Sequence, residues 1–271
     1  MAFYTVFGGR GFIGSEIVSQ LRSLSHTVFV PERDDARIFT KELGCVIYCA
    51  GYGDCNKPFD VLEANVSLLT CILQEAKFEH LIYVSSTRVY MNQTSSSEGA
   101  NLTIYDNDNR RLFNLTKLLG EEVCLRSKRK VCIVRPSNVY GVALTSPLFL
   151  PSITRNAITT GKVDMYIPRD YSKDYVSVQD VASCCINISS NQECYGEIIN
   201  IAAGYNISAK QIADILMEHT GCDVIWHEMK SFNERFPTTD ISKLKQYITG
   251  FTPNSVLGDL KYMIENFKKV L

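Results

Sequence analysis

The chain has 271 residues, enough for one large α/β domain or for a domain with a smaller lobe, and it can bury a sizeable core. Its 28 lysines and arginines nearly balance 29 aspartates and glutamates, so the composition favours neither a nucleic-acid-binding surface nor an acidic tail. The basic run RSKRK at 126–130 lies where a helix should end, and cations suit the negative end of a helix dipole.

The ten cysteines lie inside apolar runs such as GCVIYCAG and VASCCINI, which indicates reduced and buried thiols. No Cys/His spacing is typical of a zinc site, so we expect no metal. The N-terminus opens directly into a predicted strand, and no apolar run approaches the length of a membrane span. These observations predict a cytoplasmic protein that has neither a membrane nor a nucleic acid as its partner.

Short apolar runs alternate with helical patterns through the first two thirds of the chain. The predicted strands are AFYTVFG, TVFV, CVIYCA, HLIYVSS and VCIVRP, and helices are predicted at about 12–24, 59–77 and 110–127. Continuous apolar strands separated by amphipathic helices predict an α/β fold with a doubly wound parallel sheet. Only residues 31–44 separate TVFV from CVIYCA, which leaves room for one short helix, so we expect the sheet to be one edge strand short.

The first predicted strand runs through a group of glycines into the first helix, in TVFGGRGFIGSEIV. Gly9, Gly11 and Gly14 satisfy G-x-G-x-x-G, and Gly8, Gly11 and Gly14 satisfy G-x-x-G-x-x-G. Glycines let the backbone approach a pyrophosphate closely, and a helix N-terminus offers N–H groups to the anion. At the first strand-to-helix junction of an alternating α/β pattern, this motif predicts a dinucleotide-binding site.

Several stretches of the chain resemble the extended short-chain dehydrogenases/reductases, the nucleotide-sugar epimerase, dehydratase and reductase group. GGRGFIG is similar to that family's cofactor loop, CVIYCAGY to the strand beneath the cofactor, and RPSNVYG to the segment that lines the nicotinamide and sugar. KDYVSVQDVA, GEIINIAAG and TDISKLKQYITGFTP are similar to hallmarks of its substrate lobe. The resemblance implies a dinucleotide-binding Rossmann domain over 1–145. Residues 146–271 would then form mostly a substrate-binding lobe, with segments that return to the first domain around 175–205.

The resemblance also implies NAD or NADP as the cofactor. The cofactor-binding residues that it implies are Gly8, Gly9, Arg10, Gly11, Phe12, Ile13, Gly14, Glu32, Arg33, Ala50, Gly51, Tyr52, Lys117 and Pro136. Glu32 could accept hydrogen bonds from the adenosine ribose, which favours NAD. Arg10 and Arg33 could meet a 2′-phosphate, which favours NADP. Alternatively Arg10 is a solvated loop residue, and Glu32 and Arg33 form a surface pair. The balance favours NADP, and NAD stays open.

The family's redox chemistry uses a Ser/Thr, a Tyr and a Lys, the last two spaced Y-x-x-x-K on one helical face. Ser86 matches the first position and Lys117 the third, but Phe113 stands at the tyrosine position. Loss of a positioned general acid/base costs about 10²- to 10⁴-fold in rate. Lys117 does not decide the matter, because in the family this lysine also hydrogen-bonds the nicotinamide ribose. Ser86 does not decide it either, since serine is common in loops.

The substrate side of the resemblance is carried by Ser86, Asn138, Lys173 and Arg235. Asn138 matches a position that contacts the sugar or diphosphate, Lys173 replaces an arginine that is common in the family, and Arg235 resembles an arginine that clamps the diphosphate. Each is also compatible with an ordinary surface or loop residue. Together they suggest a nucleotide-sugar pocket.

Three functions are compatible with this pattern. The first, which we favour, is an NAD(P)-dependent nucleotide-sugar reductase or epimerase in which Ser86, a water or a substrate hydroxyl relays the proton. The second is a dinucleotide-binding protein without redox turnover, acting as a sensor, scaffold or partner subunit. The third is a dehydratase or isomerase that uses other acid/base groups. By analogy with the family, we expect a homodimer formed through the helices at 59–77 and 110–127.

Overall fold

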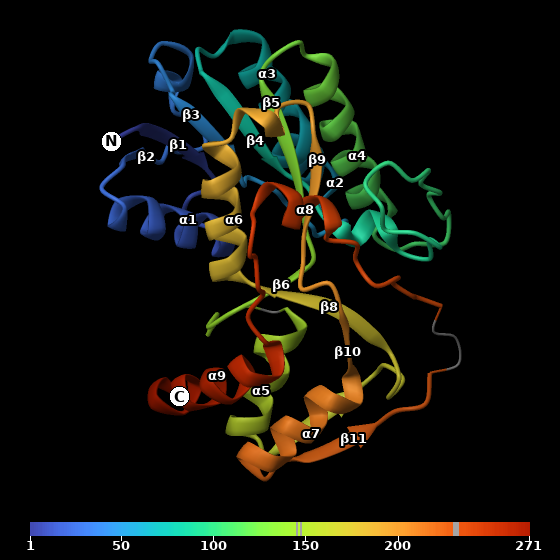
Figure 1. Ribbon diagram of the computed structural model, residues 1–271. Helices are drawn as coiled ribbons and strands as arrows, with labels where there is room; N and C mark the ends of the chain where they lie inside the picture. The colour runs from blue at the N-terminus through green and yellow to red at the C-terminus, as the bar shows by residue number, and fades with distance from the viewer. Residues whose placement is uncertain (145, 147, 230–232) are drawn as a thin grey trace.

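The computed structural model describes residues 1–144, 146, 148–229 and 233–271, and its larger part is built on a parallel six-stranded sheet (Figure 1). In spatial order the strands are β2 (Thr27–Phe29), β1 (Phe3–Phe7), β3 (Cys45–Tyr48), β4 (His80–Val84), β5 (Val131–Pro136) and β9 (Ile198–Ile201). β3, β4 and β5 are buried along their whole length, which accounts for their continuous apolar sequences. The predicted doubly wound parallel sheet is confirmed.

The sheet ends at β2, as the short segment before β3 predicted. Residues 30–44, all of which the structure describes, contain the 3₁₀ turn η1 (Ala36–Phe39) and no strand of the sheet. The Asp35 side chain caps this turn by accepting a hydrogen bond from the Arg37 N–H. The segment is too short for a crossover helix and a further strand.

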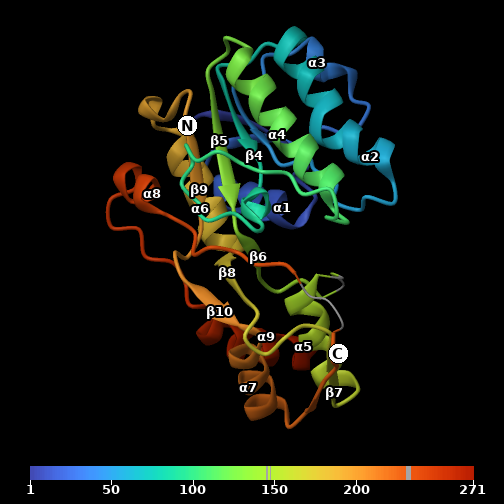
Figure 2. The same ribbon diagram turned by 90° about the vertical axis from the view of Figure 1, so that its right-hand side faces the viewer.

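Helices cover both faces of the sheet (Figures 1 and 2). On one face α1 (Phe12–Ser23) packs against α6 (Val178–Ser189), over a core that includes Val6, Ile47 and Ile82. The other face carries α2 (Pro58–Leu62), the π-helical turn η2 (Glu63–Ser67), α3 (Leu68–Glu75) and α4 (Arg111–Arg126). Side chains alternate between the two faces along each strand, so Phe7, Val46 and Leu81, each next to a residue of the first core, point into this second core.

The smaller part has its own core, below the sheet in Figure 1. Its helices are α5 (Phe149–Thr159), α7 (Ala209–Thr220) and α9 (Val256–Val270). β7 (Lys162–Met165) pairs with β11 (Asp223–Trp226), and β8 (Ser172–Ser177) pairs with β6 (Asn138–Tyr140) and β10 (Asn206–Ser208). Leu260, Ile264 and Phe267 are spaced three or four residues apart, so they form the buried stripe of α9.

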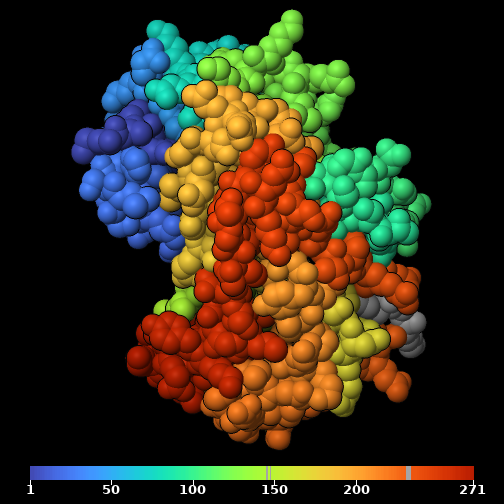
Figure 3. Space-filling view, in the orientation of Figure 1, coloured from blue at the N-terminus to red at the C-terminus, as the bar shows by residue number. Residues whose placement is uncertain are grey.

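The chain passes between the two parts several times, which fixes one against the other. After β11 it returns to the sheet, where α8 (Ser242–Tyr247) packs on β9, and it then descends to α9; Figure 3 shows these orange to red segments extending over both parts. At the junction the buried Asp174 carboxylate accepts hydrogen bonds from the Ser137 hydroxyl at 2.6 Å and from the Ala203 N–H at 2.9 Å. Such a bridge stabilises the geometry of any cleft between the parts.

The ten cysteines are all free, and seven of them are buried. Among the described residues, no helix combines the length and apolar character that crossing a membrane requires. The remaining short turns are η3 (Thr87–Tyr90) and η4 (Gln192–Cys194).

Candidate functional site

The glycine motif forms the turn between β1 and α1, and it is packed tightly. Gly8 has φ +72°, and a Cβ at Gly8 would lie 2.7 Å from the Ala50 nitrogen. A Cβ at Gly14 would lie 2.2 Å from the Gly8 carbonyl oxygen. Among the residues that the structure describes, no side chain caps the N-terminus of α1 at Gly11, so the first turn keeps N–H groups for an anion. The turn therefore has the shape and the donors of a phosphate cradle.

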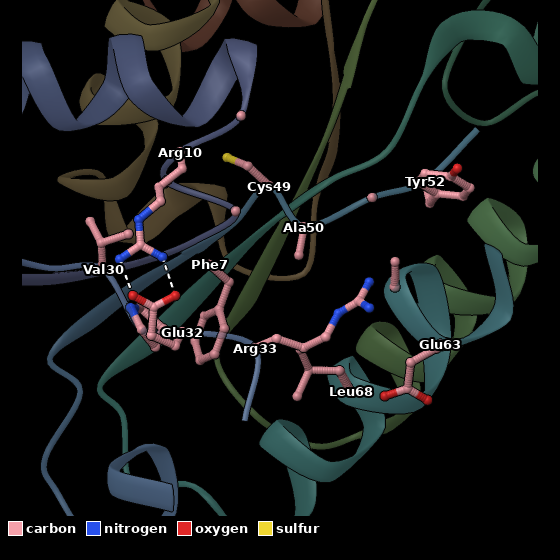
Figure 4. Close-up of a pocket in the computed structure, with 16 residues that line it drawn as sticks. Phe7, Arg10, Val30, Glu32, Arg33, Cys49, Ala50, Tyr52, Glu63 and Leu68 are labelled. Atoms are coloured by element: carbon pink, nitrogen blue, oxygen red, sulfur yellow. Dashed lines mark hydrogen bonds and ion pairs between the residues drawn. The ribbon is translucent and has the colours of Figure 1, made fainter. Parts of the chain in front are cut away.

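A first cavity, the loop cavity, lies beside this turn (Figure 4). The predicted cofactor residues that line it are Gly8, Gly9, Arg10, Gly11, Glu32, Arg33, Ala50, Gly51 and Tyr52. The buried Asn65 side chain fixes one wall, because its amide oxygen accepts from the Tyr52 N–H and its amide nitrogen donates to the Tyr52 carbonyl oxygen. The segments that follow β1, β2 and β3 thus meet at one end of the parallel sheet.

Arg10 and Glu32 form a two-point ion pair at the edge of the loop cavity, drawn as dashed lines in Figure 4. Both side chains are largely exposed, and the hydrogen bond to Glu32 raises the pKa of the Arg10 guanidinium. Glu32 therefore pairs with Arg10, and the alternative pairing of Glu32 with Arg33 is not the one that the structure shows.

A second cavity, the α4 cavity, lies on the other side of the glycine turn. The predicted residues that line it are Gly8, Gly11, Phe12, Ile13, Gly14, Gly51, Tyr52, Ser86, Phe113, Lys117 and Pro136. Lys117 is only 4% exposed, and its Nζ donates a hydrogen bond to the Val84 carbonyl oxygen at 2.9 Å. Burial lowers the pKa of Lys117 to about 8. A Cβ at Gly51 would lie 3.1 Å from Nζ, so a side chain there would crowd the lysine.

Phe113 gives the α4 cavity an apolar wall at the position where the pattern predicted a tyrosine. Its ring centroid lies 5.8 Å from Lys117 Nζ and 4.6 Å from the Arg110 guanidinium carbon. The Tyr83 ring also lies near Lys117, 5.1 Å from Nζ. However, the Tyr83 hydroxyl is buried and donates to the Asn65 carbonyl oxygen at 3.2 Å, and Tyr83 does not line the cavity. Tyr52 is the residue that brings a phenol to the lining.

Ser86 lies at the carboxyl end of β4, where its hydroxyl accepts a hydrogen bond from the Arg88 N–H at 3.1 Å and caps η3. Its position thus serves the local fold as well as the cavity. Behind it, the neighbouring Ser85 donates to Glu121, and Glu121 forms a buried two-point pair with Arg135. This network holds β4, α4 and β5 in register beneath the cavity.

A third cavity, the lobe cavity, opens between the sheet and the smaller part. Asn138 and Lys173 both line it, together with Tyr171 and Glu234. Lys173 Nζ lies 3.7 Å from the Glu234 carboxylate, and burial lowers the pKa of Lys173 to about 8. Arg235 is exposed, and its main chain is fastened to Asn92 by hydrogen bonds of 2.8 Å. The structure therefore brings Asn138 and Lys173 together but leaves the Arg235 side chain outside this group.

A fourth and smaller cavity, the junction cavity, shares lining residues with the α4 and lobe cavities, and it contains two arginines that the sequence interpretation missed, Arg88 and Arg110. Arg88, Arg110 and Lys173 line it with Ser86, Phe113 and Asn138. Arg88 is buried and pairs with Asp108 at 2.7 Å and with Glu234 at 3.3 Å. Arg110 is the N-cap residue of α4, and its position three residues before Phe113, within the helix that the sequence predicted, could have pointed to it. No local signal links Arg88 to Glu234.

Comparisons with known proteins give a consistent result. A family model described as "NAD dependent epimerase/dehydratase family" matches residues 4–202. A search of curated proteins gave no match. Among solved structures, MoeE5 in complex with UDP-glucose and NAD is similar with a TM-score of 0.85 and 19% identity, covering 99% of each chain.

Two further solved structures share the fold. A UDP-glucose 4-epimerase from Thermotoga maritima with UDP-glucose has a TM-score of 0.78 and 20% identity, covering 98% of this chain and 99% of its own. A dTDP-glucose 4,6-dehydratase from Bacillus anthracis in complex with NAD has a TM-score of 0.82 and 16% identity, covering 99% of this chain and 97% of its own. At these identities the likeness establishes the fold alone.

Proposed function

The chain belongs to the NAD-dependent epimerase/dehydratase family, and from that premise we propose that it binds a nicotinamide dinucleotide and acts on a nucleotide-linked sugar. We propose a reductase or epimerase whose redox step is altered or weakened by Phe113. The observation that carries this proposal is the α4 cavity, where the uncapped start of α1 shares one space with Ser86, Phe113 and Lys117. The UDP-glucose bound in two similar structures, MoeE5 and the Thermotoga maritima epimerase, supports the substrate class.

The residues present fit the coenzyme. A Cβ at Gly8 or Gly14 would clash with the backbone of Ala50 or of Gly8, so the glycines are what allow the tight turn that presents the α1 N-terminus to a diphosphate. When bound, the coenzyme supplies the hydride acceptor or donor. Lys117 can donate to the nicotinamide ribose in addition to Val84, because an ammonium carries three donors and one is in use. We therefore assign the loop cavity to the adenosine side and the α4 cavity to the nicotinamide side.

The proton at the reacting sugar oxygen needs a carrier other than residue 113. We propose that the Ser86 hydroxyl, a water or a substrate hydroxyl relays it. Ser86 lines both the α4 and the junction cavities, which supports contact with both coenzyme and sugar. Lys117, with a pKa of about 8, can exchange a proton with such a relay near neutral pH. The relay lacks a phenol held by a neighbouring lysine, so we expect slow turnover.

The choice between NAD and NADP depends on the Arg10–Glu32 pair. Arg10 was one of two cations that favoured NADP, but its guanidinium is engaged by Glu32. A 2′-phosphate would have to separate this pair and lie beside a carboxylate, whereas ribose hydroxyls can donate to Glu32. We propose that the protein prefers NAD, in place of the NADP that the sequence alone favoured.

We propose the second candidate, a coenzyme-binding protein without turnover, only on the strength of Phe113. The experiment that separates the two uses purified protein, NAD or NADPH, and a panel of UDP-, GDP-, CDP- and dTDP-sugars. Nicotinamide absorbance detects a reductase, and chromatography of the sugar nucleotides detects an epimerase, which regenerates its coenzyme. Turnover of any sugar supports the enzyme. Coenzyme uptake without turnover supports the second candidate, and failure to bind either coenzyme would refute both.

We also propose the division of labour and the assembly that the family suggests. Residues 1–145, with segments that return around 175–205, would hold the coenzyme, and most of 146–271 would hold the sugar nucleotide. A second copy would cover the exposed apolar side chains of α2 and α4, which include Phe59, Leu115 and Leu119. Light scattering should show a dimer that Leu119→Lys dissociates. Leu24→Lys, at another exposed leucine on the far side of the sheet, is the control.

A further inference from the structure

Arg110 is a cation without a counter-ion at the centre of the candidate site. Its guanidinium lies over the Phe113 ring, 4.6 Å from the centroid, and it lines both the lobe cavity and the junction cavity. Within the described part of the chain, the guanidinium makes no hydrogen bond and no ion pair; the hydrogen bonds of Arg110 are made by its main chain. The five N–H donors of this guanidinium are therefore not used by any described residue.

The neighbouring carboxylates are already engaged. Asp108 accepts hydrogen bonds from Arg88 at 2.7 Å, from the Asn114 side chain at 2.7 Å and from the Arg110 N–H at 2.8 Å. Glu234 accepts from the Tyr171 hydroxyl at 2.9 Å, and it pairs with Arg88 and Lys173. Three cations thus share two carboxylates, and the unmatched charge is on Arg110.

Leaving that charge unmatched has a cost. Burial lowers the pKa of Arg110, and the charge on Arg88 lowers it further. A partly buried guanidinium is stabilised when an anion accepts its hydrogen bonds, and its planar fork fits the two oxygens of a carboxylate. No described side chain accepts the hydrogen bonds of this guanidinium, so an anion that enters the site can accept them.

We infer that the substrate carries a carboxylate on its sugar ring, and that Arg110 binds this carboxylate. The inference rests on the proposed function, and it narrows the substrate from nucleotide-linked sugars to nucleotide-linked sugar acids. The sugar has to lie against Ser86 and Phe113 to be within reach of the nicotinamide, and Arg110 lines this same small cavity. The anion beside Arg110 is then part of the sugar, and the diphosphate lies farther out along the lobe cavity.

The test compares acid and neutral sugars that share a nucleotide. With NAD present at saturation, calorimetry gives Kd for UDP-glucuronate against UDP-glucose and for GDP-mannuronate against GDP-mannose, with UDP and GDP as sugar-free probes. We expect the acid of the preferred pair to bind at least tenfold more tightly than the neutral sugar. Arg110→Gln should remove most of this preference, and Arg110→Lys should keep part of it because the charge remains. Arg111→Gln removes an adjacent exposed arginine and should leave the preference intact.

Each result has one meaning. If the native protein binds acid and neutral sugars equally well, the inference is wrong, whichever variants fold. If Arg110→Gln weakens UDP or GDP alone as much as the sugar acids, Arg110 binds the diphosphate and the inference is also wrong. If neither nucleotide nor any of its sugars binds while NAD does, the proposed function itself fails, and with it the premise of this inference.

Discussion

The loop cavity and the junction cavity are built in opposite ways. The loop cavity is made by segments that directly follow the neighbouring strands β1, β2 and β3, and tight backbone contacts shape it. The junction cavity collects residues from 86 to 236, and paired charges shape it. A backbone cradle tolerates little variation, whereas a cavity lined by side chains can be changed one residue at a time. The altered position, Phe113, accordingly lies where the α4 and junction cavities meet.

Restoring the phenol is the strongest test of this contrast. We expect Phe113→Tyr to raise turnover of the best nucleotide sugar by about 10²- to 10⁴-fold, because it returns a positioned acid/base beside Lys117. Initial rates of sugar-nucleotide conversion measure the effect, followed by nicotinamide absorbance for a reductase and by chromatography for an epimerase. Phe39→Tyr adds the same hydroxyl at an exposed position of η1, outside the four cavities, and should change nothing.

A loss of activity in Phe113→Tyr would contradict the account of a weakened site. It would mean that the junction cavity has been rebuilt around another proton route, in which the phenol obstructs the substrate or Arg110. Phe113 does not line the loop cavity, so the affinity for ADP, which carries only the adenosine side of the coenzyme, should not change in either case and serves as an internal control.

The second prediction concerns the buried Lys117 in the α4 cavity, whose lowered pKa should make the stability of the protein depend on pH. Its pKa is about 8 in the folded protein and 10.5 in the unfolded chain, so between these values the unfolded state binds the extra proton. The free energy of unfolding therefore rises with pH across this window, by up to about 3 kcal/mol for this group. Lys117→Met should lack the rise, which urea titrations at pH 7.5, 9 and 10 can measure. Lys245→Met, at an exposed position of α8, controls for the loss of a lysine.

A difference between native protein and Lys117→Met that stays constant with pH would show that the Lys117 ammonium is solvated. The α4 cavity would then be more open than the hydrogen bond to Val84 indicates.

The sequence predicts the loop cavity better than the junction cavity, because residues close together in the chain form the first and distant residues form the second. The glycine turn, the missing edge strand and the shared face of Phe113 and Lys117 are set by neighbours in the chain, so spacing alone reveals them. Arg88 and Glu234 pair across 146 positions, and only the folded chain brings them together. The substrate-binding role expected for Arg235 stays a prediction. The hydrogen bond that tethers its main chain to Asn92 is a feature of the fold that no motif encodes.

A single added methyl group should distort the glycine turn between β1 and α1. We expect Gly14→Ala to lose about 2 kcal/mol of stability, since the new Cβ would lie 2.2 Å from the Gly8 oxygen, and to bind NAD about tenfold more weakly. Thermal unfolding and calorimetry measure both effects. Gly99→Ala is the matched control, because a Cβ there meets nothing within 4 Å. Unchanged NAD affinity in a destabilised Gly14→Ala would separate the turn from coenzyme binding.

The smallest effect is expected at the rim of the loop cavity. There the side chains of Arg10 and Glu32 line the cavity, whereas backbone atoms line the glycine turn. Glu32→Ala leaves Arg10 free to meet a 2′-phosphate, so affinity for NADP should rise about tenfold relative to NAD. Competition between the two coenzymes measures the ratio directly, and Asp34→Ala removes a nearby exposed carboxylate as the control. An unchanged ratio would mean that selectivity is set by the backbone there as well. A rise would show that exposed charges at the rim tune the coenzyme preference of the loop cavity, although close backbone contacts shape its glycine turn.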